Sequence, residues 1–96
     1  MTIAAAAALV PDRVPMQKVL HSDSGNKQQW GYDEGARTAY IIFAKPGTQV
    51  ALYSYSNVPF AVAKAVRSSS DDSQTLDDLL VKDPGSYPYA RLYPLA

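Results

Sequence analysis

The chain has 96 residues, no cysteine, and nine basic and nine acidic residues, so its formal net charge is zero. This length fits one small domain. The lack of cysteine excludes disulfides and a thiolate zinc site, and it fits a reducing compartment, so we expect a cytoplasmic protein. Zero net charge argues against a protein that mainly binds the phosphate backbone of duplex nucleic acids, because such proteins are usually basic.

Residues 1–15 are predicted to form an N-terminal arm with little of its own to bury, followed by one domain over residues 16–96. The arm contains the apolar run IAAAAALV at 3–10, far shorter than the ~20 residues that a membrane helix needs. No basic residue precedes this run, as a signal peptide would require. We therefore expect no membrane association. The alanine run is expected to be either a short docked helix or a mobile arm that stops at Pro11 and Pro15, and such an arm would dock on a neighbouring subunit.

The first half of the domain is typical of strands. A weak strand is predicted over 16–20, and a second over QQWGYD at 28–33, with Trp30 and Tyr32 on one side. Two β-rich runs, TAYIIFA at 38–44 and QVALYSY at 49–55, then flank a Pro-Gly pair that suits a type II turn. This pattern predicts a β-hairpin.

The hairpin register is predicted from a pairing of Lys45 with Thr48. The face of the hairpin that points away from the helices is then rich in tyrosine, with Tyr40 opposite Tyr53 and with Tyr55 beside them. A slip of one residue would exchange these faces. The face that the helices cover would carry four apolar side chains: Ile41, Phe43, Val50 and Leu52.

Two short helices are predicted after the hairpin, over 57–70 and 75–82. Asn57 and Thr75 are expected to cap them, and Asp78 to complete a capping box with Thr75. The strand YPYARLY at 87–93 is expected at a sheet edge, because Pro88 and Pro94 cannot donate ladder hydrogen bonds. The predicted fold class is α+β, a small antiparallel β-sheet packed against two short helices. Their expected inward side chains are Phe60, Val62, Ala63, Val66, Leu76, Leu79 and Leu80.

The order of GYD, hairpin, YSYSNVP, helix, short helix and YPYARL resembles the KTSC domain. That domain is a small module at the C-terminus of some lysyl-tRNA synthetases, and it also occurs as a free-standing bacterial or phage protein. The resemblance depends on Tyr53-Ser54-Tyr55 followed by Val58-Pro59 at a helix start, and it covers residues 22–93. The sequence SSSDDSQTL stands where the family usually has a Ser-x-Gly-aromatic element. The resemblance implies the α+β fold and, as the usual suggestion for the family, RNA binding.

Seven tyrosines with interleaved cations suggest a binding surface. Aromatic rings stack on bases, and arginine contacts rings and phosphates. Tyrosine is also a good strand residue, and tyrosine and arginine are enriched in protein–protein interfaces. Arg91 is expected to be partly exposed, with its guanidinium near the ring of Tyr89 or Tyr53. The candidate ligand-binding residues are Tyr53, Tyr55, Arg67, Tyr87, Tyr89 and Arg91.

No catalytic residue, metal site or cofactor is expected. His21 is the only histidine, and its sequence neighbours Ser22 and Asp23 do not converge as a nucleophilic triad does. They also supply too few ligands for a metal. The acids crowded into residues 71–83 are interpreted as a solvated helix edge and helix-start residues.

Two hypotheses for the function follow. The first is a non-enzymatic binding module for RNA or a small nucleotide, which includes a phage-type protein that sequesters nucleotides. The alternative is a structural or interaction protein whose tyrosine-rich face is buried in a homo-oligomer or a larger assembly. We expect a homo-oligomer under both hypotheses, since a subunit interface can itself form a ligand pocket.

Overall fold

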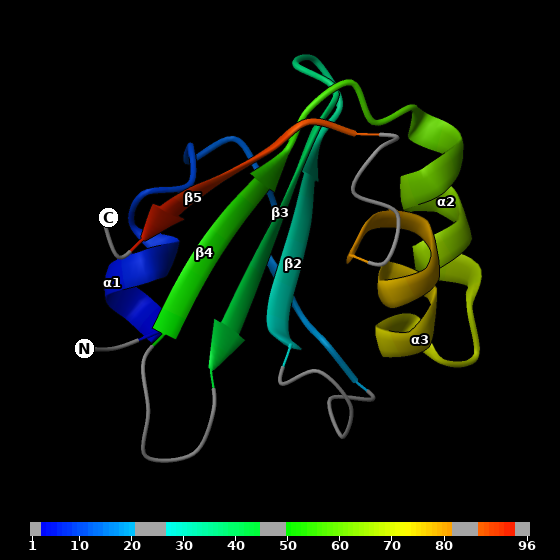
Figure 1. Ribbon diagram of the computed structural model, residues 1–96, viewed down its shortest axis with the longest axis horizontal. Helices are drawn as coiled ribbons and strands as arrows, with labels where there is room; N and C mark the ends of the chain where they lie inside the picture. The colour runs from blue at the N-terminus through cyan, green and yellow to red at the C-terminus, as the bar shows by residue number, and fades with distance from the viewer. Residues whose placement is uncertain (1–2, 21–26, 45–49, 82–86, 94–96) are drawn as a thin grey trace.

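The protein is built around an antiparallel sheet (Figure 1). Within residues 3–20, 27–44, 50–81 and 87–93, which the computed structural model describes, this sheet has five strands that neighbour one another in chain order. They are β1 (Gln17–Lys18), β2 (Lys27–Asp33), β3 (Thr38–Ala44), β4 (Val50–Tyr55) and β5 (Tyr89–Tyr93). Since β5 pairs only with β4 in this order, the predicted edge position of the last strand is confirmed.

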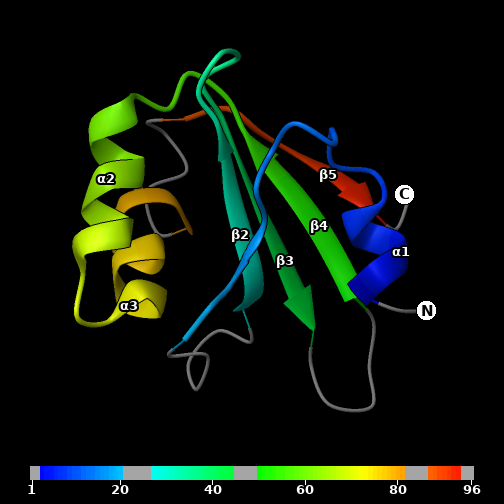
Figure 2. The same ribbon diagram turned by 180° about the vertical axis from the view of Figure 1, so that it is seen from behind.

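Helices lie against both faces of the sheet (Figures 1 and 2). On one face α2 (Phe60–Ser68) packs against α3 (Asp72–Leu76), which continues into a π-helical turn, η1 (Asp77–Val81). On the other face α1 (Ile3–Ala7) packs against β3 and β4. The predicted α+β class is confirmed, with a short helix added on the second face. None of the helices in the described part of the chain has the length and hydropathy needed to span a bilayer.

The core under α2 and α3 follows the sequence pattern closely. Most of the expected inward residues of the two helices are buried, and Leu79 is partly so. The expectation is wrong for Phe60, which stands at the first position of α2 and is 44% exposed. Tyr32 donates a hydrogen bond of 2.6 Å from its hydroxyl to the carbonyl of Val58, which ties β2 to the segment before α2. The buried residues of this helix-side core are Val19, Trp30, Tyr32, Ala39, Ile41, Tyr55, Val58, Val62, Ala63, Val66, Leu76 and Leu80.

The expectation that the arm has little to bury is wrong for its described residues, 3–15. The arm folds back on the second face of its own sheet, where the side chains of Ala6, Val10 and Val14 are buried. The arm removes the apolar side chains of this sheet face from water, which is favourable. The side chains buried in this way form a second core. The boundary between arm and domain stays a prediction. The sheet residues of this arm-side core are Tyr40, Ile42, Val50 and Leu52.

Two features of β2 hold the arm in place. A Cβ on Gly31 would lie 2.5 Å from Met16 Sδ, 3.0 Å from Val14 Cγ1 and 3.1 Å from the carbonyl oxygen of Pro15, so a larger residue here would push the arm away from β2. Two residues along the same strand, the buried Asp33 accepts hydrogen bonds of 2.7 and 3.1 Å from Arg13. This bond to Arg13 lowers the pKa of Asp33, which also accepts from the N–H of Ala36.

The predicted hairpin register is wrong by one residue. Ala44 pairs with Val50 and Ile42 with Leu52, whereas the prediction paired Phe43 with Val50 and Ile41 with Leu52. The residues between β3 and β4, 45–49, lie outside the described part of the chain. Since side chains alternate between faces, the slip turns β4 over relative to β3. Leu52 therefore lies under the arm instead of under the helices, and Tyr53 lies on the helix side beside Phe43.

Both predicted helix caps are also corrected. Asn57 has a φ of 59° and stands before the helix, and Pro59 occupies the N-cap position of α2. The next helix starts before Thr75, because Asp71 is its N-cap and accepts a hydrogen bond of 3.0 Å from the N–H of Gln74. An aspartate is as good an N-cap as a threonine, and this one comes earlier in the chain.

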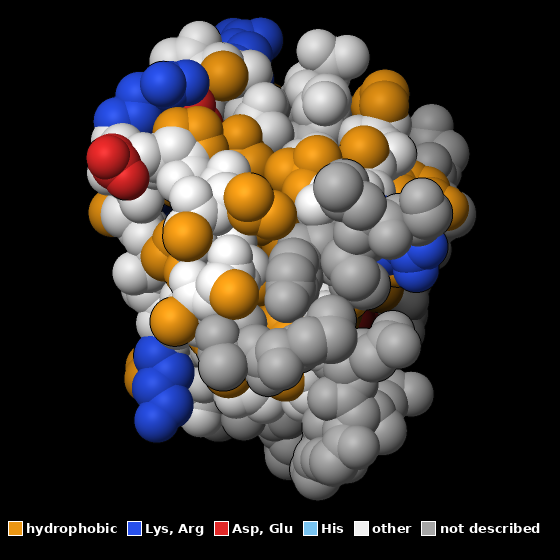
Figure 3. All heavy atoms as spheres, turned by 90° about the vertical axis from the view of Figure 1, so that its left-hand side faces the viewer, with side chains coloured by type: hydrophobic (Ala, Val, Ile, Leu, Met, Phe, Trp, Pro, Cys, Tyr) orange, Lys and Arg blue, Asp and Glu red, His pale blue; other side chains and the backbone are white. Residues whose placement is uncertain are grey.

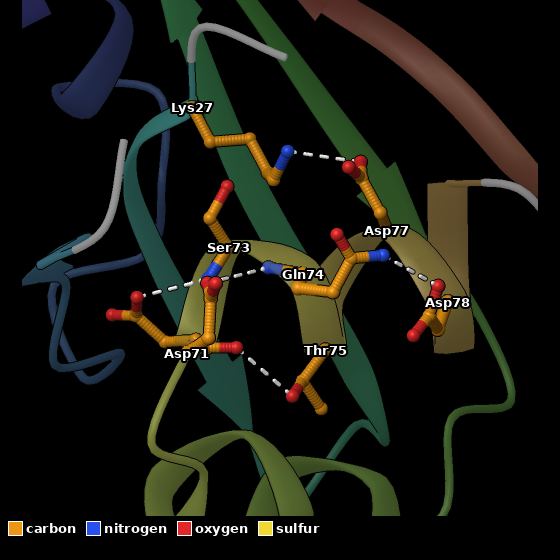
Figure 4. Close-up of polar contacts among 8 residues, drawn as sticks. Lys27, Asp71, Ser73, Gln74, Thr75, Asp77 and Asp78 are labelled. Atoms are coloured by element: carbon orange, nitrogen blue, oxygen red, sulfur yellow. Dashed lines mark hydrogen bonds and ion pairs between the residues drawn. The ribbon is translucent and has the colours of Figure 1, made fainter. Parts of the chain in front are cut away.

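The acids of residues 71–83 do not form a uniformly solvated edge. Asp71 and Asp78 are exposed, but Asp72 and Asp77 are buried. Figure 4 shows Lys27 reaching from β2 to Asp77, with an Nζ–Oδ1 distance of 2.9 Å. The lysine is fully buried, so two charges are paired beneath the sheet. Burial of a charge requires such a partner, which explains why the two residues meet.

We predict that Leu52→Ala lowers the free energy of unfolding by about 2–5 kcal/mol, because it opens a cavity under the arm. The matched control is Leu9→Ala, whose side chain is 52% exposed and whose loss should change stability by less than about 0.5 kcal/mol. Urea denaturation followed by circular dichroism measures both values. Equal stability of the two variants would contradict the second core.

The buried ion pair gives a second prediction. Lys27→Met leaves the charge of Asp77 without its partner, so it should destabilise the fold by about 3–5 kcal/mol. The double variant Lys27→Met/Asp77→Leu removes both charges and should recover most of that loss. A double-mutant cycle by urea denaturation provides the measurement. Additive losses in the double variant would show that the pair is not coupled.

Candidate ligand-binding surfaces

Three of the candidate tyrosines meet at the edge of the sheet. The ring centroid of Tyr89 on β5 lies 6.2 Å from that of Tyr53 and 6.2 Å from that of Tyr55, both on β4. Tyr53 is in turn held edge-to-face by Phe43 on β3, at 5.7 Å. Tyr89 is 57% exposed, whereas the other two tyrosines are half-buried or buried. One open ring is thus supported from below by two fixed ones.

Arg91 completes this group, which we call the tyrosine surface (Tyr53, Tyr55, Tyr89 and Arg91). It pairs with Tyr53 across the β4–β5 ladder and is exposed, as expected. The next residue on the strand, Leu92, packs on the arm-side core. Because neighbouring side chains of a strand point to opposite faces, Arg91 lies on the same face as Tyr89. The surface therefore has an aromatic ring and a cation side by side.

The environment of Tyr55 differs from that of Tyr89. Burial, together with the neighbouring Tyr53 and Tyr89, raises the pKa of Tyr55 to about 12. The buried hydroxyl thus remains protonated over the whole physiological range. Tyr55 therefore forms the buried floor of the tyrosine surface.

The other two candidate residues, Tyr87 and Arg67, are not part of the tyrosine surface. Tyr87 is half-buried and packs against the helix-side core. Arg67 is on α2, and its guanidinium lies over the ring of Trp30, 5.7 Å from the ring centroid. Among the described residues, the contact between an arginine and an aromatic ring is thus made by Arg67 with Trp30. The sequence analysis expects such a contact for Arg91. The six candidate residues thus do not gather in one place.

A pocket of about 300 Å³ opens beside Arg67. Sequence reasoning missed this site, because its parts come from β1, β2, α2 and the start of α3. One usable signal was available, since Trp30 is the only tryptophan of the chain. The lining residues are Gln17, Lys18, Leu20, Trp30, Val66, Arg67, Ser69 and Asp72.

The acidic side chains of the described residues do not gather into a metal site. Among them, no three histidine, aspartate or glutamate side chains cluster closely enough to hold a metal ion. The buried acids already have partners, since Asp77 pairs with Lys27 and Asp72 accepts backbone N–H groups from Leu20 and Ser73. His21 lies outside the described ranges.

The pKa of Tyr55 gives a third prediction. Its value in the folded protein, about 12, is above its ordinary value of 10.0. The protonated side chain therefore stabilises the fold fully below pH 10, and this contribution is lost as the pH rises from 10 towards 12. We expect Tyr55→Phe to reduce the alkaline loss of stability, and the exposed-site control Tyr89→Phe to keep it. Urea unfolding across this pH range is the measurement, and equal alkaline losses in both variants would refute the assignment.

Comparisons with known proteins support the fold. No protein-family model matches the sequence, and no curated protein matches it. Among solved structures, the fold is similar to the crystal structure of a KTSC domain protein from Yersinia pestis, with a TM-score of 0.61. The match covers 82% of this chain and 97% of that chain at 22% identity, so it concerns the fold. The chain therefore has the KTSC-like fold that the order of its sequence motifs suggested.

Proposed function

We propose that this protein is a non-enzymatic binding module for RNA or a small nucleotide, and that the tyrosine surface is its binding site. One observation carries the proposal. The exposed ring of Tyr89 is backed by Tyr53 and Tyr55 at 6.2 Å and lies on the same face as the exposed Arg91. A base can stack on the ring while its phosphate contacts the guanidinium.

The energetics of stacking favour such a surface. Stacking of a base on an aromatic side chain contributes about 1–3 kcal/mol per base. A ring already held by two others loses less rotational freedom on binding, so more of this energy is available for affinity. Arginine adds a charge-assisted hydrogen bond to phosphate. Because Tyr89 is on an edge strand and open to solvent, it suits an unstacked, single-stranded chain better than a duplex.

The same chemistry argues for binding without catalysis. The side chains of the tyrosine surface are three phenols and one guanidinium, and the phenol of Tyr55 has a pKa of about 12. A general base needs a pKa near the working pH, and the pKa of Tyr55 lies well above it. A free-standing module of this kind would act in the cytoplasm by sequestering or presenting its ligand, as a phage-type nucleotide-sequestering protein does.

A second candidate function is that of an interaction protein that forms a homo-oligomer or a larger assembly. It is favoured by the face shown in Figure 3, where hydrophobic side chains gather over α1 and the neighbouring sheet edge. On α1 and just after it, Ala4, Ala8 and Leu9 are exposed. Apolar residues on the outside of a docked arm suit a protein partner better than a nucleic acid. Under this hypothesis Tyr89 would be covered in the assembly.

The test is binding of a fluorescein-labelled oligouridylate, followed by fluorescence anisotropy. Tyr89→Ala and Arg91→Ala should each weaken binding at least about tenfold, which corresponds to ~1.4 kcal/mol. Raising the salt concentration should weaken binding by the wild type more than by Arg91→Ala, because that variant has lost a phosphate contact. Lys64→Ala, which removes an exposed cation of α2, is the matched control and should bind as the wild type does.

Multi-angle light scattering on the same preparations separates the two hypotheses. A shift of Tyr89→Ala towards monomer, with no oligouridylate or mononucleotide bound by the wild type, would support the interaction protein. The ratio of absorbance at the nucleic-acid and protein maxima adds a check on the purified protein, since a bound nucleotide raises it. Unchanged binding and unchanged mass in both variants would refute the role of the tyrosine surface altogether.

A further inference from the structure

The pocket beside Arg67 has a fixed frame. One wall is the end of β1 and the other is the C-terminal end of α2, represented by Val66, Arg67 and Ser69. Asp72 joins these walls, because its carboxylate accepts hydrogen bonds of 2.8 Å from the N–H of Leu20 and 2.9 Å from the N–H of Ser73. The width of the pocket is therefore set by protein contacts and does not depend on a ligand.

The charges of the pocket favour an anion. Lys18 and Arg67 are exposed at its lining, and neither forms an ion pair with a carboxylate of the described residues. The third charged group, the carboxylate of Asp72, is buried and already accepts two amide hydrogens. Two accessible cations thus remain against one carboxylate whose charge is compensated by amides. A carboxylate or phosphate fits such a site.

The pocket also has room for a flat apolar group. Trp30, which is only 3% exposed, and Val66 form an apolar part of the lining. The guanidinium of Arg67 lies over the indole ring, 5.7 Å from its centroid, and Arg67 is exposed. A guanidinium on an aromatic ring can still donate hydrogen bonds from its edge. A volume of about 300 Å³ is at the lower end of the usual range for small-molecule sites, ~300–1,000 Å³. This size suits one ring with one anionic group.

We propose that this pocket binds a small organic anion that consists of a flat ring with a carboxylate or phosphate. Arg67 and Lys18 hold the anionic group, and the ring of the ligand lies on the guanidinium plane of Arg67, which covers Trp30. This site shares no residue with the tyrosine surface, so the proposal goes beyond the function proposed above. A small ligand here and a nucleic-acid chain at the tyrosine surface would occupy the protein independently.

Trp30 makes the proposal testable, since it is the only tryptophan of the chain and lies in the pocket. The probes are benzoate, which combines a ring with a carboxylate, and phenyl phosphate, which combines a ring with a phosphate. Acetate and benzyl alcohol are the controls with anion only and ring only. We expect at least one of the ring-bearing anions to change the tryptophan emission saturably, with at least about tenfold higher affinity than either control. Absence of saturable binding by both would overturn the proposal.

Variants assign the binding to this pocket. Arg67→Gln should weaken binding of the ring-bearing anion about tenfold, and Lys18→Gln should weaken it severalfold. Arg91→Gln, a matched change at the tyrosine surface, should have no effect. Both pocket residues are exposed, so the variants are expected to fold, and thermal melting checks this. The shift of the indole N–H resonance of Trp30 gives a second readout, since Arg67→Gln itself alters the fluorescence.

The two proposals can fail separately. Oligouridylate binding measured on Arg67→Gln should equal that of the wild type, and benzoate or phenyl phosphate binding on Tyr89→Ala should be unchanged. If Arg67→Gln abolishes oligouridylate binding, the two surfaces form one site and the separate pocket is refuted. If Arg67→Gln binds the ring-bearing anion as tightly as the wild type, the pocket proposal is wrong whatever the tyrosine surface does.

Discussion

The pairing of Lys27 with Asp77 is the contact on which the helical layer of this protein depends. It joins the first residue of β2 to the π-helical turn after α3, at 2.9 Å and in the buried interior (Figure 4). An unpaired charge at that depth costs several kcal/mol, so the sheet and the turn must stay in register for either charge to be tolerated. The hydrogen bond from Leu20 to Asp72 adds a second link between the same two layers. The second of these links joins two residues that line the pocket beside Arg67.

The helices and the arm cover the two faces of the sheet, and this explains which of its aromatic side chains are exposed. The helices protect one face and the arm the other, with Gly31 allowing the close approach of the arm to β2. The side of β4 that carries Tyr53 continues beyond the helices to the edge strand β5, where Tyr89 is open to solvent. Aromatic side chains at such an edge are available to a ligand, whereas equivalent rings under the helices are used for packing. Tyr89 and Arg91 are thus the part of the tyrosine surface that the helices leave exposed, and Tyr55 joins it to the helix-side core.

Two sets of aromatic and cationic residues result, and the structure keeps them apart. Arg91 accompanies the tyrosines of β4 and β5, and Arg67 lies over Trp30 at the opposite side of the helix-covered face, beside β1. The first set is open and suits a chain of bases. The second lines a pocket and suits one small anion. This separation allows each hypothesis to be tested with variants that leave the other site intact.

The sequence by itself determined the element types, the edge position of YPYARLY, the inward faces of α2 and α3, and the α+β class, because periodicity and turn residues are local signals. It also indicated the tyrosines and Arg91 as a group. Only the tertiary structure decided the hairpin register, since a slip of one residue preserves the local pattern of each strand and changes only which face of β4 meets the helices. The same holds for the arm, whose alanines carry no strong pattern, and for Lys27, Arg67 and Trp30. Their partners lie far away in the chain, and such contacts depend on how the layers pack.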